Sequence, residues 1–518
     1  MEPPVTSRRQ QRSGSGRRVL RAAGAWLVAV TAALVVCVTV GFASTSTASV
    51  SVNVGATAAG PPILEGFVGT TMEFYAVPEY AGSDPSAINP VLVSLLSQLA
   101  PGQRRILRIG GASTDTTWWP VTGVARPAAV NYDLTPAWLQ TTSALVHALN
   151  AQLIVGVNLG IDRPDLAAAE AQALLSAIGP DSIRAFEIGN EPDRLAHDAV
   201  SKTAQGTVYA RPRSYGVRAF ASEFSQIRSA LPAVPVAGPG YSGAGWMSQL
   251  GRFLTAERPI SLVTFHRYPL SACGIARKSR AYPTIADLLA NSASHGLASG
   301  VAPFVAIAHA HGLPFRIDEM NSVSCGGARG VSDTFASALW ALDALFEMAH
   351  AGVDGVNIQT SPGGSYELFT PHLVNGVWQA TVRPEYYGLM MFAQAATPGS
   401  RLLPLSATGS PLVKSWATRA QNGTTRVVLI NKDVAHAHIV HLTLAGVRGS
   451  AALQRLLAPS ARATSGVTFG GQSFGAVTFN GELAGQPKHA LVRPRAGVYT
   501  VRLPAASAAL LTLRRAAA

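Results

Sequence analysis

Residues 183–195 read IRAFEIGNEPDRL, and this stretch carries the pattern that decides the fold. A β-rich run with Glu187 inside it ends at the polar residues Asn190 and Glu191, and Pro192 then breaks it. Burying an unpaired carboxylate costs free energy, so a glutamate at such a point needs a cleft or a partner. If other runs of the chain end in the same way, the partner is expected at one of their ends.

The same pattern recurs between residues 66 and 397. Each β-rich run ends in glycine, asparagine or another polar residue, and Ala/Leu-rich segments with helical spacing follow most runs. Eight successive strand–helix units predict an α/β fold, a (β/α)8 TIM barrel, with an open doubly wound sheet as the alternative. In order, the runs are EGFVGTTMEF, RILRIGG, LIVGVNLG, IRAFEIGNE, VPVAGPG, LVTFHRYP, PFRIDEMN and DGVNIQT.

Residues 398–518 have a different texture. The segment VKSWATRAQNGTTRVVLINK alternates on both sides of Asn422 and Gly423, and an Asn-Gly pair is a strong signal for a tight hairpin. Further short strands follow, separated by glycine- and proline-containing turns. We therefore predict a C-terminal all-β sandwich domain. Residues 49–65 are a linker, and their strand-like SVSVNV is a candidate extra strand of that domain.

The N-terminal segment has the features of an export signal. Residues 1–21 form a basic region with six arginines and one glutamate, and residues 22–43 contain no charge. Small residues up to Ala48 then offer a cleavage site. We expect residues 22–48 to be a signal peptide or an uncleaved signal-anchor, and the rest of the chain to be secreted or held outside the cell. The export route, general or twin-arginine, stays open.

Composition excludes several classes of function. The chain has 518 residues, is 48% hydrophobic and carries a formal net charge of +13, of which the first 21 residues supply +5. The remaining basic excess fits an acidic ligand or a solvated surface, and it forms no basic stripe interleaved with aromatics, so nucleic acid is not expected as a partner. Zinc-protease, CxxC and phosphate-loop motifs are absent from the sequence, and we expect no metal and no organic cofactor.

Catalytic groups of a (β/α)8 barrel stand at the C-terminal ends of its strands. Two of the polar residues found there are glutamates in matching positions, Glu191 after strand four and Glu319 after strand seven, which face each other across the barrel mouth. Glycoside hydrolysis requires such a pair, because one carboxyl protonates the leaving oxygen while the other attacks or activates water. The full set is Glu73, Arg108, Asn158, Asn190, Glu191, His266, Tyr268, Asp318, Glu319 and Gln359.

Four segments in order resemble glycoside hydrolase family 79, the heparanase and β-glucuronidase family within clan A of the retaining glycosidases. They are RIGGASTDTTWW, EIGNEPD, HRYPL and RIDEMNSVSCGG, and the resemblance extends over roughly residues 60–518. It implies that Glu191 is the acid/base and Glu319 the nucleophile of a retaining mechanism, with their carboxyls roughly 5–5.5 Å apart.

The resemblance also implies supporting roles. Asn190 is expected to hydrogen-bond the sugar 2-hydroxyl, and Arg108 to keep the nucleophile ionised. Tyr268 or His266 is expected to orient Glu319. The other expected substrate contacts are Glu73, Asn158 and Gly326.

The loop after Glu319 departs from the family pattern. Family members commonly supply glycine and tyrosine contacts there, but SVSCGGARG contains no tyrosine, and Ser324, Arg329 or Tyr366 are candidate substitutes. The resemblance implies an exo-β-glucuronidase acting on uronic-acid-containing glycans. Three alternatives stay open: a retaining β-glycosidase of neutral sugars, an endo-acting enzyme on acidic polysaccharide, and a non-catalytic glycan-binding surface protein.

Two of the three cysteines, Cys273 and Cys325, lie beyond the N-terminal segment. An even pair in an exported chain favours one disulfide, with two buried free thiols as the alternative. They fall in the loops after strands six and seven, which are neighbours in a barrel. A bridge there would stiffen the wall beside Glu319.

Overall fold

The computed structural model describes residues 48–203 and 206–513. The predicted export signal or anchor, apart from Ala48, lies outside this part of the chain. Within these residues no helix combines the length and hydropathy that crossing a membrane requires.

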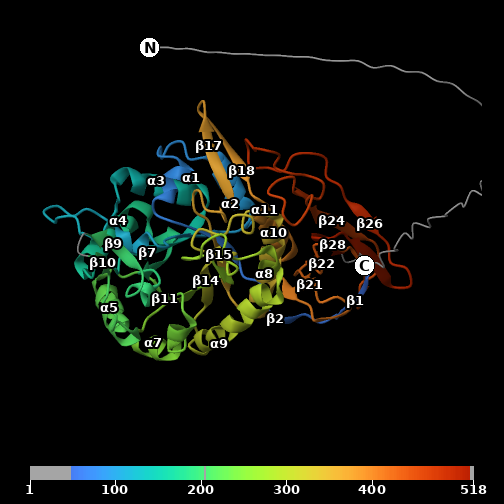
Figure 1. Ribbon diagram of the computed structural model, residues 1–518, viewed down its shortest axis with the longest axis horizontal. Helices are drawn as coiled ribbons and strands as arrows, with labels where there is room; N and C mark the ends of the chain where they lie inside the picture. Colours follow the sequence, from blue (N-terminus) through green and yellow to red (C-terminus); the bar gives the residue numbers. More distant parts are fainter. Residues whose placement is uncertain (1–47, 204–205, 514–518) are drawn as a thin grey trace, which may run out of the picture. The chain divides into compact units, whose positions relative to one another are not determined.

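Eight parallel strands form a closed barrel in which neighbours follow chain order. Three of them, β7, β11 and β14, are labelled in Figure 1. The predicted (β/α)8 barrel is confirmed, and each strand overlaps one of the eight quoted runs; β7 begins two residues before its run and β11 ends one residue after its run. The strands are β3 (Val68–Met72), β4 (Arg105–Ile109), β7 (Ala151–Val157), β8 (Ile183–Ile188), β11 (Val236–Tyr241), β12 (Leu262–His266), β14 (Phe315–Met320) and β16 (Gly355–Gln359).

Helices cover the outside of the barrel, which is why the strands are buried on both faces and read as nearly continuous apolar runs. Asn89 and Thr135 cap α2 and α3 by accepting backbone hydrogen bonds with their side chains. The larger helices are α2 (Pro90–Gln98), α3 (Pro136–Ala148), α4 (Pro164–Ile178), α5 (Val217–Ala230), α7 (Leu250–Ala256), α9 (Leu297–Ala310), α10 (Phe335–His350) and α11 (Pro384–Ala395). Shorter ones are α1 (Ala76–Ala81), α6 (Ala244–Met247) and α8 (Ile285–Leu289).

The C-terminal region forms two sheets that share a hydrophobic core. The smaller sheet has the order β20 (Leu405–Thr408), β1 (Ala48–Val54), β23 (His438–Leu444) and β27 (Val498–Leu503). The larger sheet has the order β2 (Ala59–Pro62), β19 (Arg401–Leu402), β21 (Val413–Arg419), β22 (Thr425–Asn431), β28 (Ser507–Leu513), β24 (Ala451–Leu457) and β25 (Thr468–Phe469), and β26 (Ala490–Val492) pairs with β24.

Strand β1 precedes the barrel in sequence but pairs in parallel with β23 and antiparallel with β20. Its alternate residues Val50, Val52 and Val54 are buried in the core between the two sheets. Alternation of this kind is expected for a strand with one face in a core and the other facing solvent.

The β domain packs on α10 of the barrel. Trp416 of β21 stacks on Phe346 with ring centroids 5.5 Å apart and donates to Asp343 at 2.8 Å. Lys432 forms a buried ion pair with the same carboxylate at 2.6 Å. A buried pair resists removal of either partner, because the remaining charge would be left without compensation.

Short strands elaborate the C-terminal mouth of the barrel. A hairpin, β17 (Phe369–Val374) and β18 (Val377–Val382), follows β16 and projects at the top of Figure 1. In the loops after β12 and β14, β13 (Leu270–Ser271) pairs with β15 (Val323–Ser324), and Cys273 is bonded to Cys325. The predicted disulfide is confirmed. Two further pairs are β5 (Thr117–Trp118) with β6 (Tyr132–Asp133), and β9 (Ala199–Thr203) with β10 (Gly206–Tyr209).

Candidate active site

Glu191 follows the tip of β8 in a left-handed conformation, with φ 46° and ψ 56°. Its backbone N–H donates to the Gly240 carbonyl at 3.0 Å, and its own carbonyl accepts from Arg194 at 2.7 Å. A non-glycine residue pays roughly 1–3 kcal/mol for this backbone and persists in it only where the surroundings fix it. The strain is thus located at the glutamate that the sequence singled out.

Glu319 lies near the end of β14 and is 7% exposed. One oxygen of Glu319, one oxygen of Glu191 and a ring nitrogen of His266 all lie within 4.8 Å of one another. The two glutamates, 128 positions apart in the sequence, are therefore brought together at the mouth of the barrel.

Arg108, fully buried at the end of β4, connects the members of the site. Its Nη1 donates to Glu319 at 2.9 Å, its Nε to Glu187 at 2.7 Å, and its Nη2 to the Asn190 side-chain oxygen at 3.0 Å. Burial alone would lower the pKa of Arg108, but the charges of Glu187 and its neighbours outweigh burial and raise it. Arg108 is a permanent cation that fixes both Glu319 and Asn190.

His266 and Tyr268 hold one glutamate each. The His266 Nδ1 lies 3.1 Å from Glu191, and the Tyr268 hydroxyl donates to Glu319 at 2.9 Å. Burial lowers the pKa of His266, but the carboxylate of Glu319 and its other acidic neighbours outweigh that effect and raise the pKa to about 9. Burial, and then the charge of Glu319, raise the pKa of Tyr268 well above its usual range, so its hydroxyl remains a donor.

Glu187 and Asp318 form a second carboxyl pair below the first. Their side chains are fully buried, and a carboxyl oxygen of one lies within 4.8 Å of a carboxyl oxygen of the other. Like charges this close favour a proton on one of the two carboxyls. Burial, and then the charge of Glu187, raise the pKa of Asp318 well above its usual range. Burial would also raise the pKa of Glu187, but Arg108 outweighs it and lowers the pKa to about 2. Asp318 is therefore the protonated partner.

Sequence reasoning did not assign a role to Glu187 or Asp318. A usable signal was nevertheless present, since both are acidic residues in otherwise buried strand runs and Arg108 is the one cation among the strand ends. A buried carboxylate must be paired or protonated.

Glu73 lies at the same mouth, at the end of β3. It accepts hydrogen bonds from the backbone of Ala112 and Ser113 and from the Ser113 hydroxyl, and Gln359 approaches it at 3.4 Å. Burial, and then the charge of Glu319, raise the pKa of Glu73 to about 7. A Cβ at Gly111 would lie 2.4 Å from Glu73, so glycine is required at that position.

Asn158, expected as a substrate contact, has a different position. It is fully buried, its amide donates to the Thr117 carbonyl at 2.6 Å, and its oxygen accepts from the Ile161 backbone at 3.0 Å. Because one N–H of the amide and its oxygen are used by loop backbone, Asn158 shapes the loops, and its role as a substrate contact stays a prediction.

The loops after β14 and β16 are joined beside Glu319. Gly326 has a left-handed φ of 83°, and its carbonyl accepts from Ser365 at 2.6 Å. A Cβ at Gly327 would lie 2.8 Å from the backbone nitrogen of Tyr366, whose ring centroid is 6.4 Å from that of Tyr268. The tyrosine missing from one loop thus has a counterpart, Tyr366, in the next.

Two groups of donors have the spacing of a metal site, Glu187–His266–Asp318 and Glu191–His266–Glu319. Arg108 lies 2.7–3.2 Å from carboxylate oxygens of both groups. Its positive charge opposes the binding of a second cation at either group. The arrangement instead suits proton transfer and nucleophilic attack by carboxylates.

Comparisons with known proteins identify similar glycoside hydrolases. Residues 415–510 match the glycosyl hydrolase family 79 C-terminal beta domain. A beta-glucuronidase of Neurospora crassa is 25% identical, over 74% of this chain and 75% of its own, and one of Aspergillus niger is 26% identical, over 87% and 91%.

Two solved structures share the fold. A 4-O-α-L-rhamnosyl-β-D-glucuronidase from Fusarium oxysporum aligns with a TM-score of 0.65 at 21% identity, covering 89% of this chain and all of the other. A GH51 arabinofuranosidase from Xanthomonas axonopodis pv. citri aligns with a TM-score of 0.66 at 17% identity, covering 90% and 100%. The chain is therefore similar to members of glycoside hydrolase family 79 in its C-terminal domain and in its curated relatives, and it is a glycoside hydrolase.

Proposed function

We propose that the protein is an exported, retaining exo-β-glucuronidase that acts on uronic-acid-containing glycans. The observation that carries this proposal is the Glu191–Glu319 pair, whose nearest oxygens lie within 4.8 Å at the barrel mouth. Retaining glycosidases hold their carboxyl groups roughly 5–5.5 Å apart, whereas inverting enzymes leave roughly 6.5–9.5 Å for a water molecule.

In the first step, Glu319 attacks the anomeric carbon while Glu191 protonates the departing oxygen. Arg108 and Tyr268 each bind one oxygen of Glu319, which orients the carboxylate for attack. In the second step, Glu191 takes a proton from water, the water attacks the same carbon, and Glu319 leaves as a carboxylate.

Asn190 is well placed to read the sugar. Arg108 donates to the Asn190 oxygen, so the asparagine NH2 group is the part of the amide that is left to bind substrate. We assign it to the sugar 2-hydroxyl, where a hydrogen bond strengthens as charge develops in the transition state.

The choice of a uronate rests on the curated relatives, both of which are beta-glucuronidases. Tyr366, with its neighbours Gly326 and Gly327, supplies a hydroxyl and backbone groups beside Glu319, and such groups can bind a sugar carboxylate. Burial, and then the charge of Glu319, raise the pKa of Tyr366, so its hydroxyl stays protonated as a donor.

Export is supported by the N-terminal sequence and by the disulfide. Disulfides persist in oxidising compartments outside the cytosol, and Cys273–Cys325 lies on the loops that wall the site. Removal or retention of residues 22–48 is tested by N-terminal sequencing of the protein recovered from the producing cell.

The experiment that tests the function is hydrolysis of a panel of aryl β-glycosides, with an aryl α-L-arabinofuranoside added. We expect release from the β-glucuronide and a loss of at least about 1,000-fold for Glu319→Gln, since a nucleophile supplies several kcal/mol of barrier reduction. Release from a neutral glycoside alone would contradict the glucuronidase assignment. Equal rates for wild type, Glu191→Gln and Glu319→Gln would contradict the assignment of the site.

A further inference from the structure

A cavity of about 880 Å³ lies outside the site described above. It is lined by the loop after β12, helix α8, the loop after β14 and three segments of the β domain, and we call it the interdomain groove. None of Glu191, Glu319, Arg108, His266 or Tyr268 lines it. Its volume falls in the range of ligand sites, roughly 300–1,000 Å³.

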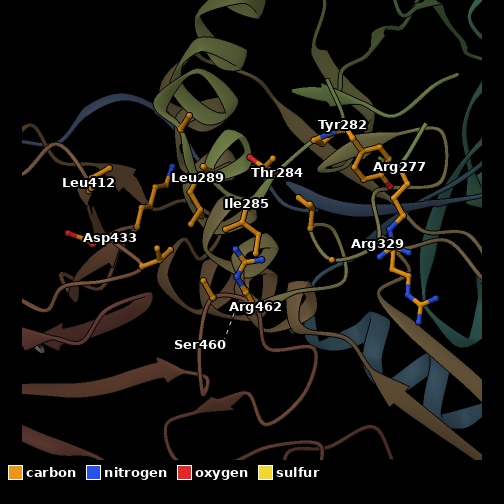
Figure 2. A pocket seen from close by; sticks show the side chains of 18 residues that line it. Arg277, Tyr282, Thr284, Ile285, Leu289, Arg329, Leu412, Asp433, Ser460 and Arg462 are labelled. Atoms are coloured by element: carbon orange, nitrogen blue, oxygen red, sulfur yellow. Dashed lines mark hydrogen bonds between the residues drawn. The ribbon is translucent and has the colours of Figure 1, made fainter. Parts of the chain in front are cut away.

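Three arginines give the interdomain groove its charge. Arg277 and Arg329 lie at one end of it and Arg462 near its middle, below Ile285, as Figure 2 shows. All three are exposed. Among the residues that the structure describes, no carboxylate forms an ion pair with any of the three guanidinium groups. These charges are therefore available to a ligand.

The other charged residues of the interdomain groove are already engaged. Lys432 is buried and paired with Asp343. Asp433 is the one acid in the lining; it accepts from backbone N–H groups of its own turn and lies 3.2–3.3 Å from ring nitrogens of His436 and His438. It lies toward the end opposite Arg277 and Arg329. Asp333 and Asp287, next to the lining, already accept hydrogen bonds from Gly330 and Thr284.

The remaining lining is largely apolar, with Tyr282, Ile285, Leu289, Val331 and Leu412 among its side chains. Pyranose rings present C–H faces that pack on such surfaces, while their carboxylates need cations. A lining of this kind with guanidinium groups at its edge is complementary to a chain of acidic sugars.

The interdomain groove shares loops with the active site. Arg277 comes four positions after Cys273 and Arg329 four positions after Cys325, and the disulfide joins the two loops. Arg329 lies ten positions after Glu319, in the loop that follows β14. A glycan in the interdomain groove would contact the two loops that border the active site, without entering the active site.

We propose that the interdomain groove is a secondary binding site for an acidic oligosaccharide, a segment of uronate-bearing glycan other than the unit that is cleaved. The choice of an acidic glycan among anions rests on the proposed function. Arg277, Arg329 and Arg462 bind the carboxylates, and the apolar lining binds the sugar faces.

The test is calorimetric titration of the full chain with hexagalacturonate, which carries a carboxylate on every sugar and contains no β-glucuronide bond. Binding to it is therefore independent of whether the protein is a β-glucuronidase. The neutral probe is maltohexaose. The variants are Arg277→Glu/Arg462→Glu and, as a control with the same kind of charge change on exposed α7, Arg252→Glu. Thermal melting of each protein checks its fold.

We expect hexagalacturonate to bind wild type and Arg252→Glu alike, and the double variant to bind about tenfold or more weakly, since two exposed cations are replaced by anions. Binding should also weaken with added salt. The proposal is overturned if hexagalacturonate does not bind, if maltohexaose binds equally well, or if the folded double variant binds like wild type.

Discussion

The hydrogen bond from Tyr268 to Glu319 makes a kinetic prediction that depends on the order of the chemical steps. In the free enzyme it stabilises the Glu319 carboxylate at 2.9 Å. In the glycosyl-enzyme of the proposed retaining mechanism it would face an uncharged ester. Since Glu319 regains its charge when the intermediate is hydrolysed, loss of this bond slows the second step more than the first. Tyr268→Phe keeps the ring that packs beside Tyr366, so the fold should be retained.

A hydrogen bond to a charged group contributes about 1.5–3 kcal/mol, and each 1.36 kcal/mol changes a rate about tenfold. We therefore expect kcat of Tyr268→Phe to fall roughly 10- to 150-fold, KM to fall with it, and kcat/KM to change much less. Stopped-flow hydrolysis of an activated aryl glucuronide should show a burst of aryl alcohol equal to the enzyme concentration. A variant without a burst, in which kcat/KM falls and KM does not, would refute this reasoning.

Three further predictions concern His266, Asp318 and the Cys273–Cys325 disulfide. The pKa of His266 is raised to about 9 from an ordinary value of about 6.5. Protonated His266 therefore stabilises the fold fully below about pH 6.5, and this stabilisation is lost as the pH rises through about 9. The difference in melting temperature between wild type and His266→Gln should shrink over that range. Asp318→Asn keeps a group that can donate to Glu187, so its kcat should stay within about threefold of wild type. Asp318→Leu leaves the Glu187 oxygen that Arg108 does not bind without a donor, and should lose about 1.5–3 kcal/mol of unfolding free energy in urea titrations. Cys273→Ser/Cys325→Ser opens a loop whose ends are 52 positions apart, and loop entropy sets a loss of about 4 kcal/mol, measurable by the same titration.

The barrel could be predicted because its strands are buried on both faces and end in polar residues. This gives apolar runs with polar ends, which can be recognised in the sequence itself. Once eight units are counted, the positions of Glu191 and Glu319 follow, since β11 and β12 separate their strands and both glutamates lie at the same mouth. The loop disulfide followed for the same reason, because β12 and β14 are neighbours. In each case a residue's place depended on the strand that carries it.

Features that depend on contacts between distant side chains were not predictable in this way. Glu187 resembles a tolerated polar residue until Arg108, 79 positions earlier, is found to reach it. Asn158 has the same position in its strand as its functional neighbours, but the Thr117 carbonyl of another loop takes its amide. The hairpin β17–β18 and helix α11 were likewise not predicted, since the hydrophobic periodicity is weaker in the long segment after the last barrel strand.

The most direct test of the account is to trap the covalent intermediate. In 2-deoxy-2-fluoro-β-D-glucuronyl fluoride, the 2-fluoro group slows both formation and hydrolysis of the glycosyl-enzyme. The anomeric fluoride is a good leaving group and keeps the first step fast enough, so the glycosyl-enzyme accumulates if a nucleophile exists. Peptide mapping by mass spectrometry should then locate one sugar on Glu319, in the peptide that contains RIDEMN. A sugar found on Glu191, or turnover of the activated reagent without any covalent adduct, would contradict the assignment of Glu319 as the nucleophile of a retaining glycosidase.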